Sequence, residues 1–299
     1  MRIISDNDIR TLGIEPRQCV EWVREAFLMK DRCQLPPKIS LHPQGSDFIN
    51  TMPCLLPEEY HRFGCKVVSR IKGTKPALKS EMMIVDSLTG ETVAVMNCDW
   101  ITAMRTGAVA ALAISCLRNS NARIYSFVGL GVIGHTTLEC LLPMIADSGC
   151  VVRLKRYEDH AEKTAVAFAE RFPGITFEIC DTMECLVADA DVVVSCITDA
   201  DGLLVEDVSL FKPGVLVVPV HTRGFQNCDK IFDRVFADDE GHVRGFRYFN
   251  EFKGFAELSQ VLDGSDPGRE NDCQRILSYN IGLGLHDILF GTKILEIIG

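Results

Sequence analysis

A glycine-rich segment at residues 128–134 carries the strongest chemical signal in the chain. It reads Val-Gly-Leu-Gly-Val-Ile-Gly, with an apolar strand expected before it and a helix expected after it. In such a strand–loop–helix unit the first glycine permits a tight turn, the second lets the backbone approach a pyrophosphate, and the third lets the helix pack on the strand. Free N–H groups at the start of the helix would then meet the phosphates. The segment predicts a dinucleotide-binding loop formed by Gly129, Gly131, Val132, Ile133 and Gly134; a glycine turn without a ligand is the alternative.

A cation ends the second strand of the same unit, where dinucleotide-binding proteins distinguish NAD from NADP. The strand ends in Leu154-Lys155-Arg156. An acidic residue there would hold the ribose 2′-OH of NAD, whereas a guanidinium suits a 2′-phosphate. A surface charge pair is the simpler explanation, and Glu158 or Asp159 could still reach the ribose. We expect NADP or NAD as cofactor, with NADP favoured.

Two further cations stand in apolar surroundings. Arg105 is the only positive charge in the apolar stretch 99–117, which has helical spacing. A buried guanidinium needs an anion, either a structural carboxylate or the carboxylate of a bound substrate. Lys66 lies in an expected strand, 63–71, on the face that it shares with Val68 and Arg70. A solvated strand face is the simpler explanation for Lys66.

His221 directly follows another expected strand, 215–220. Ligands of open α/β sheets bind beyond the carboxyl ends of the strands. A histidine at that position could exchange protons near neutral pH, although it could also simply cap a loop.

The elements around these residues divide the chain near residue 120. The first part looks like mixed α/β with a hairpin. In the second part strands alternate with helices, which indicates a parallel sheet with right-handed crossovers. From about residue 271 a helical segment is expected to run to the end and to return to the first part. The other expected elements are helices at 16–30, 132–146 and 161–172, and strands at 63–71, 81–85, 92–96, 124–128, 150–154, 175–179, 192–195 and 215–220.

Composition and charge exclude several classes of protein. Apolar residues make up 47% and charged residues 24% of the chain, as in globular proteins. A net charge of -10 argues against nucleic acid and anionic membranes as partners. The longest apolar run is too short to cross a bilayer, and the N-terminus lacks a signal-peptide pattern. The 13 cysteines contain no CxxC pair, so we expect no metal site and a soluble protein with reduced thiols in the cytoplasm.

Over nearly its whole length the sequence resembles the ornithine cyclodeaminase/mu-crystallin family. The resemblance implies an α/β protein in which a Rossmann-type parallel-sheet domain, residues 119–279, is inserted in a mixed α/β substrate-binding and dimerisation domain, residues 1–118 plus 280–299. It also implies a homodimer. The motifs that carry the resemblance are Met52-Pro53, Gly64-Cys65-Lys66, Asp86 to Gly90, Ala103-Met104-Arg105-Thr106, the glycine loop, Glu257-Leu258-Ser259, Gly264 and Gly268-Arg269.

The family acts on small α-amino or α-imino acids, and the resemblance assigns roles to single residues. Arg105 would grip the substrate carboxylate with two hydrogen bonds, and Lys66 would lie beside the reacting nitrogen or the carboxylate. Lys38 stands where the family usually has a carboxylate-binding arginine. A lysine keeps the positive charge but lacks the planar guanidinium that can bind a carboxylate with two hydrogen bonds. Thr106 would contact the cofactor phosphates or the substrate. Ser195, Ile197 and Thr198 would border the cofactor, and Val218 and Gly282 would approach the nicotinamide.

His221 departs from the aspartate that the cyclodeaminases carry at that position. An imidazole can donate a proton to nitrogen but cannot supply a fixed negative charge to an ammonium substrate. The loop 72–79 also looks short, and two of its lysines, Lys75 and Lys79, are expected near the substrate side chain, where they would disfavour the cationic side chain of ornithine.

The leading hypothesis is hydride transfer between NAD(P) and the α-carbon of a small amino or cyclic imino acid, with Lys66 and His221 as catalytic residues. This describes an imine reductase or an amino-acid dehydrogenase. One alternative is ornithine cyclodeamination to proline and ammonia. The other is a cofactor-bound binding protein without turnover.

Overall fold

A computed structural model of the chain describes residues 1–146, 149–198, 200, 202–220, 225 and 230–299. The chain forms two compact units, one of Met1–Arg105 with Gly282–Gly299 and one of Thr106–Ile281. The bounds expected from the sequence were 118/119 and 279/280. The first division instead falls inside a helix, α3 (Asp99–Leu117), which continues from one unit into the other.

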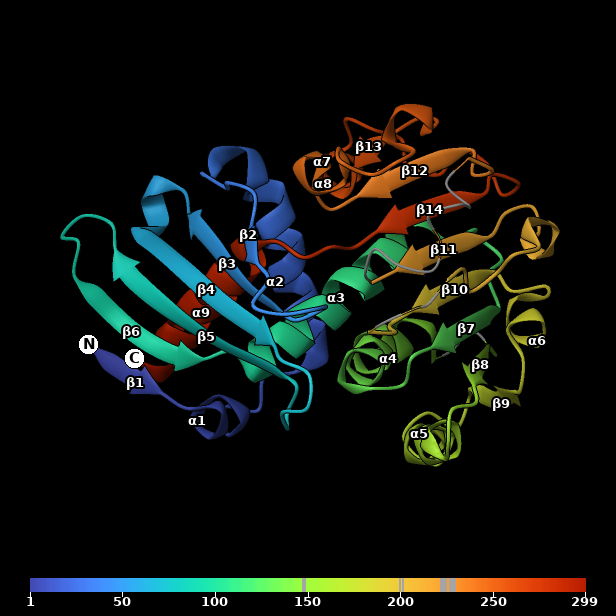
Figure 1. The fold of residues 1–299 in the computed structure, drawn as a ribbon, viewed down its shortest axis with the longest axis horizontal. Helices are drawn as coiled ribbons and strands as arrows, with labels where there is room; N and C mark the ends of the chain where they lie inside the picture. Colours follow the sequence, from blue (N-terminus) through green and yellow to red (C-terminus); the bar gives the residue numbers. More distant parts are fainter. Residues whose placement is uncertain (147–148, 199, 201, 221–224, 226–229) are drawn as a thin grey trace. The chain divides into compact units, whose positions relative to one another are not determined.

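The first unit is built on a six-stranded sheet with the order β1-β6-β5-β4-β3-β2 (Figure 1). The β1–β6 pair is parallel and the other pairs are antiparallel. Its strands are β1 (Arg2–Ile4), β2 (Ile39–Leu41), β3 (Phe48–Leu55), β4 (Arg62–Arg70), β5 (Leu78–Asp86) and β6 (Thr92–Asn97), and its helices are α1 (Asp6–Arg10), α2 (Pro16–Met29), α9 (Gly284–Ile298) and two short 3-10 helices, Lys30–Arg32 and Glu58–Tyr60.

The C-terminal helix α9 covers one face of this sheet. It packs on β3, β4 and β5 and contacts α2 on its other side. Gly291 allows the close approach, since a Cβ there would lie 2.3 Å from the Met82 side chain. Every second residue of the strands is buried beneath α9, while the alternate residues face away from it. The helix therefore seals the face to which Lys66 belongs.

The helix α3 is long and apolar enough to cross a membrane by length and composition alone. Its 18-residue apolar window is 78% buried within the protein, as is typical of a core helix. The sequence had indicated only the stretch after Arg105 as a strongly apolar run.

The second unit contains an eight-stranded sheet with the order β13-β12-β14-β11-β10-β7-β8-β9, and every neighbouring pair is parallel. The α/β class with a Rossmann-type parallel sheet is thus confirmed. The strands are β7 (Ile124–Val128), β8 (Val151–Lys155), β9 (Thr176–Cys180), β10 (Val192–Ser195), β11 (Leu216–Pro219), β12 (Arg234–Ala237), β13 (Ala256–Glu257) and β14 (Ile276–Tyr279). The helices are α4 (Val132–Ile145), α5 (His160–Ala169), α6 (Met183–Val187), α7 (Glu240–Val243), α8 (Leu258–Asp263) and the 3-10 helices Val208–Leu210 and Phe249–Glu251.

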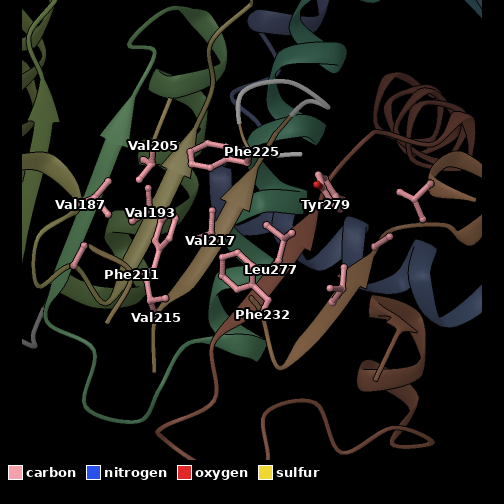
Figure 2. Close-up of a cluster of buried hydrophobic side chains, with 14 residues drawn as sticks. Val187, Val193, Val205, Phe211, Val215, Val217, Phe225, Phe232, Leu277 and Tyr279 are labelled. Atoms are coloured by element: carbon pink, nitrogen blue, oxygen red, sulfur yellow. The ribbon is translucent and has the colours of Figure 1, made fainter. Parts of the chain in front are cut away.

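Side chains from β10, β11 and β14 meet the phenylalanines of the intervening loops in one apolar core (Figure 2). Phe211 and Phe232 are fully buried there, with ring centroids 5.7 Å apart. Burying one such ring contributes about 1.5–3 kcal/mol. This core supports the strands whose carboxyl ends carry the candidate cofactor residues.

The expectation of a helix from about residue 271 to the end was wrong for the part before residue 284. Ile276 lies in β14 within the parallel sheet, and α9 begins only at Gly284. A run of four apolar or small residues has no periodicity that separates a buried strand from a helix. By contrast, the strands expected at 124–128 and 192–195 have those bounds in the structure.

Candidate active site

Lys66 lies in the middle of β4 and is fully buried. The antiparallel register sets it between Met52 on β3 and Met82 on β5, on the face covered by α9. An ammonium in such a position is costly unless it is paired. The solvated strand face that the sequence allowed is therefore not where Lys66 lies.

Arg105 and Lys66 share one carboxylate, that of Asp287 in α9. The Arg105 Nε donates a hydrogen bond of 3.0 Å to Asp287 Oδ1, and the Lys66 Nζ lies 2.7 Å from Asp287 Oδ2. Asp287 is fully buried and Arg105 is 6% exposed. Three segments that are distant in sequence thus meet in one buried charge cluster.

A short chain of hydroxyl groups supports Lys66 from the other side. Its Nζ also donates a 3.3 Å hydrogen bond to the Thr102 Oγ1, one turn before Arg105 in α3. The Thr102 hydroxyl is 3.0 Å from that of Ser80 on β5, and the Ser80 hydroxyl donates to the carboxylate of Asp99. These contacts fix the end of the Lys66 side chain relative to α3.

The protonation states in this cluster follow from burial and from the neighbouring charges. Burial and the Arg105 charge lower the pKa of Lys66 to about 8, against the opposing influence of Asp287. Burial would raise the pKa of Asp287, but Arg105 and Lys66 outweigh it and lower the pKa. Burial and Arg105 lower the pKa of His286 to about 3, so this fully buried ring is neutral. Near neutral pH the cluster holds two cations and one anion.

One positive charge is therefore not balanced by a carboxylate. Arg105 uses its Nε for Asp287, and within the described part of the chain its two terminal Nη groups contact no carboxylate. Gly282 lies against this end of the guanidinium: its φ is +91°, and a Cβ there would be 2.3 Å from the Arg105 Nη1. The two Nη groups of an arginine can bind a carboxylate through two parallel hydrogen bonds.

The two other lysines predicted to bind substrate lie differently. Lys38 is half-buried and precedes β2 by one residue. Continuing the register of Ile39 with Thr51 puts Lys38 level with Met52, which pairs with Lys66. Lys79 is exposed and lies on the opposite face of the sheet, because it alternates with the buried Ser80. The structure therefore separates Lys79 from Lys66 and Arg105.

In the second unit, the glycine loop joins β7 to α4. Gly129 has a φ of +87°, and a Cβ there would lie 2.5 Å from the backbone after β10. A Cβ on Gly134 would lie 2.3 Å from the carbonyl oxygen of Gly129, whereas one on Gly131 would meet nothing within 4 Å. The first and third glycines are thus required by packing, and the second faces open space. This is the division of roles that a pyrophosphate-binding loop needs.

Other predicted cofactor residues gather at the same edge of the parallel sheet. Ser195 ends β10 level with Val128 on β7 and with Pro219 on β11. Ile197 is half-buried and Thr198 exposed directly beyond Ser195, and Val218 is buried in β11. Val132 is exposed and Ile133 half-buried in the first turn of α4, and Thr106 is the first residue of this unit. His221 lies outside the described residues.

Arg156 follows β8 and is held by two acidic residues. Its Nε donates to Asp181 Oδ1 at 2.5 Å, and its Nη1 contacts Glu162. The side chain remains 45% exposed. A 2′-phosphate at this position would have to compete with both carboxylates for the guanidinium.

Asp287 was not predicted from the sequence. A signal was present, because His286-Asp287 is a polar pair in the first turn of a largely apolar C-terminal segment, much as Arg105 is the one positive charge in its apolar stretch. The predicted need of Arg105 for an anion left the partner open, and only the fold shows that α9 provides it. Among the described residues, no group of three or more potential metal ligands lies together.

Comparison with known sequences decides the family. A model of the ornithine cyclodeaminase/mu-crystallin family matches residues 6–298. The chain belongs to this family. The resemblance inferred from the motifs is therefore confirmed.

Relatives and solved structures agree with this assignment. The chain is 28% identical to a nodulation efficiency protein of Rhizobium meliloti over 88% of this chain and 83% of the relative. It is 26% identical to a Delta(1)-pyrroline-2-carboxylate reductase of Bacillus cereus over 99% of this chain and 96% of the relative. A similar structure is that of Thermococcus litoralis Delta(1)-pyrroline-2-carboxylate reductase in complex with NADH and L-proline, with a TM-score of 0.85, 21% identity, and coverage of 99% of this chain and 97% of that one.

Proposed function

We propose that this protein is a nicotinamide-dependent oxidoreductase that transfers hydride to or from the α-carbon of a small amino or cyclic imino acid. The observation that carries the proposal is the buried pair of Lys66 and Arg105, whose two positive charges face a single carboxylate. A substrate carboxylate would neutralise the remaining charge. The reductase activity named for the Bacillus cereus and Thermococcus litoralis proteins supports the same substrate class.

The glycine loop supports the nicotinamide dinucleotide as cofactor. Gly131 leaves room for a pyrophosphate at the start of α4, and Ser195, Ile197 and Thr198 extend the same sheet edge. The bound cofactor would supply or accept the hydride. Arg156 would decide between NADP and NAD: it favours the 2′-phosphate of NADP, while its contacts with Asp181 and Glu162 oppose it.

The chain's own charged groups would position the substrate and provide the proton. The Nη groups of Arg105 would bind the carboxylate, with Lys38 as an additional cation, and Gly282 would keep the guanidinium in place. The ammonium of Lys66 can donate a proton to the imine nitrogen, and hydride plus proton then convert C=N into CH–NH. Lys66 would regain its proton from water or from another acid, such as a protonated His221.

One assay tests this function. The purified protein is incubated with NADH or NADPH and pyrroline-2-carboxylate or piperideine-2-carboxylate, and the absorbance of the reduced cofactor is followed. We expect the wild-type protein to oxidise the reduced cofactor steadily. Arg105→Met should abolish this oxidation. The control Lys163→Met, which removes an exposed cation of α5, should leave the rate unchanged. In parallel, L-ornithine with catalytic NAD is analysed for proline and ammonia. Formation of proline without net cofactor turnover would refute the redox proposal.

A second copy of this chain is the proposed partner. The sheet face opposite α9 carries an apolar row that crosses five strands in register: Ile3, Val95, Met83, Cys65 and Pro53. Ile3 is 80% exposed and Met83 is 40% exposed in the single chain. Contiguous apolar patches on a protein surface often mark protein–protein interfaces. Light scattering should give the mass of a homodimer, and Met83→Lys should yield a monomer while Val166→Lys, on α5, should not.

The cysteines fit a reducing compartment, which we propose to be the cytoplasm. None of the cysteines that the structure describes is in a disulfide. Most are buried and act as small apolar side chains.

A further inference from the structure

We propose that Asp287 is a positioning residue of the substrate site, which aligns Lys66 and Arg105 through one shared carboxylate. The inference rests on the proposed function for its substrate but on the structure for its geometry. Each carboxylate oxygen takes one cation, Oδ1 the guanidinium and Oδ2 the ammonium. Neither cation has another ion-pair partner among the described residues.

The way Arg105 is held shows what this alignment achieves. Asp287 occupies the Nε side of the guanidinium, so the two Nη groups remain together for an incoming carboxylate. The backbone at Gly282 closes one flank of that end. A guanidinium fixed in this way has little freedom to lose when a substrate binds. Asp287 therefore contributes to substrate affinity without contacting the substrate.

The same carboxylate controls the charge on Lys66. Burial and Arg105 both disfavour the ammonium form, and Asp287 is the anion that opposes them. The other titratable groups around the pair do not supply this charge: His286 on α9 is neutral, and burial raises the pKa of Cys98, while the contact with Cys33 and burial raise the pKa of Cys54. Removal of the Asp287 charge should therefore lower the pKa of Lys66.

The sign of the pH effect follows directly. Below a pKa of about 8, Lys66 is an ammonium and can bind a carboxylate or donate a proton; above it, Lys66 is a neutral amine. In Asp287→Asn this loss should begin at a lower pH. A shift of the pKa by one unit corresponds to about a tenfold change in the acid dissociation constant.

The first experiment measures the pKa of Lys66 without turnover. Full-length protein labelled with carbon-13 at the lysine Cε is titrated by NMR, and the Lys66 resonance is assigned from its absence in Lys66→Met. We expect Asp287→Asn to lower the pKa of Lys66 by at least about one unit. An unchanged pKa in a folded Asp287→Asn protein would overturn the proposal. A lack of turnover in the wild type would defeat the proposed function alone, because this readout needs no substrate.

The second experiment separates positioning from structural support. The pH profile of KM for the imino acid is compared in wild type, Asp287→Asn, and Asp191→Asn as a control. Asp191 is a buried carboxylate of the second unit that pairs with Lys212. We expect Asp287→Asn to raise KM about tenfold or more. The rise of KM at alkaline pH should also begin at a lower pH in this variant than in the wild type. Asp191→Asn should lower thermal stability only. If Asp287→Asn lost thermal stability but kept the wild-type pH profile of KM, the role of Asp287 would be structural, and the proposal would be wrong.

Lys66→Met provides a check against misfolding. In the Lys66→Met protein the rise of KM at alkaline pH should be absent. Adding Asp287→Asn to this variant should then leave the pH profile of KM unchanged. A further pH shift in the double variant would mean that Asp287 acts on another group, which would contradict the proposal.

Discussion

The glycine loop and the charge cluster differ in how the fold assembles them. The loop of the second unit is formed by consecutive residues, 128–134, between β7 and α4. The cluster of the first unit joins Lys66, Arg105 and Asp287, of which the last two are 182 residues apart. Contiguous residues form the loop, and two of its three glycines are required by packing, Gly129 against the backbone after β10 and Gly134 against the carbonyl oxygen of Gly129. The cluster exists only when β4, α3 and α9 are packed together.

This difference predicts different effects of substitutions in the two regions. A change in the cluster leaves charges buried without partners, which is costly far beyond the lost contact. A change in the loop affects either the packing of the loop or the space for the ligand, depending on which glycine is replaced.

The largest loss of activity is expected from Arg105→Lys. The charge is kept, but the fork that holds Asp287 on one side and a carboxylate on the other is lost. We expect kcat/KM for the imino acid to fall by about 100- to 1,000-fold, the equivalent of roughly 3–4 kcal/mol. Steady-state kinetics measure this, and cofactor affinity, measured by NADH fluorescence, should stay within the wild-type range. Wild-type kinetics in Arg105→Lys would show that a point charge is sufficient.

The glycine loop can be divided by two matched alanine variants. Gly134→Ala forces a Cβ against the carbonyl of Gly129, so thermal stability and cofactor affinity should both fall. Gly131→Ala meets no protein atom, so stability should be unchanged while the Kd of the reduced cofactor rises by about 10- to 100-fold. Calorimetry and fluorescence titration measure the two quantities. Equal losses of stability in both variants would contradict the assignment of separate roles.

Gly282→Ala tests whether that glycine serves substrate or cofactor. A Cβ would lie 2.3 Å from the Arg105 Nη1 and would be strained at a φ of +91°. We expect KM for the imino acid to rise about tenfold, since the guanidinium must shift by part of an ångström. A rise in the Kd of the cofactor instead would favour the nicotinamide contact implied by the family resemblance.

The smallest change in KM for the imino acid is expected from Lys79→Ala. Lys79 is exposed on the sheet face opposite Lys66, so its removal should change KM by less than about twofold. Lys38→Ala is the informative comparison, because Lys38 lies level with Met52 and thus on the face of Lys66; KM should rise several-fold there. If Lys79→Ala had the larger effect, the substrate would not bind on the α9 side of the sheet.

The sequence predicted elements of both units and missed elements of both. The strands at 124–128 and 192–195 were expected with the right bounds, because each is a short apolar run between clear turn signals. The strands β2 and β3 were not expected, since Phe48–Leu55 mixes polar and apolar residues without strict alternation. β14 was taken for a helix, because its four residues have no period.

The glycine loop and the family could be inferred from the amino-acid order alone, because both are determined by short contiguous motifs that keep their spacing. The sequence also showed that Arg105 would need an anion, since an apolar helix cannot leave a guanidinium unpaired. Only the tertiary structure decided that the anion is Asp287, that Lys66 shares it, and that Lys79 faces away. Such choices depend on which strand face α9 covers, and that is set by packing between segments far apart in the chain.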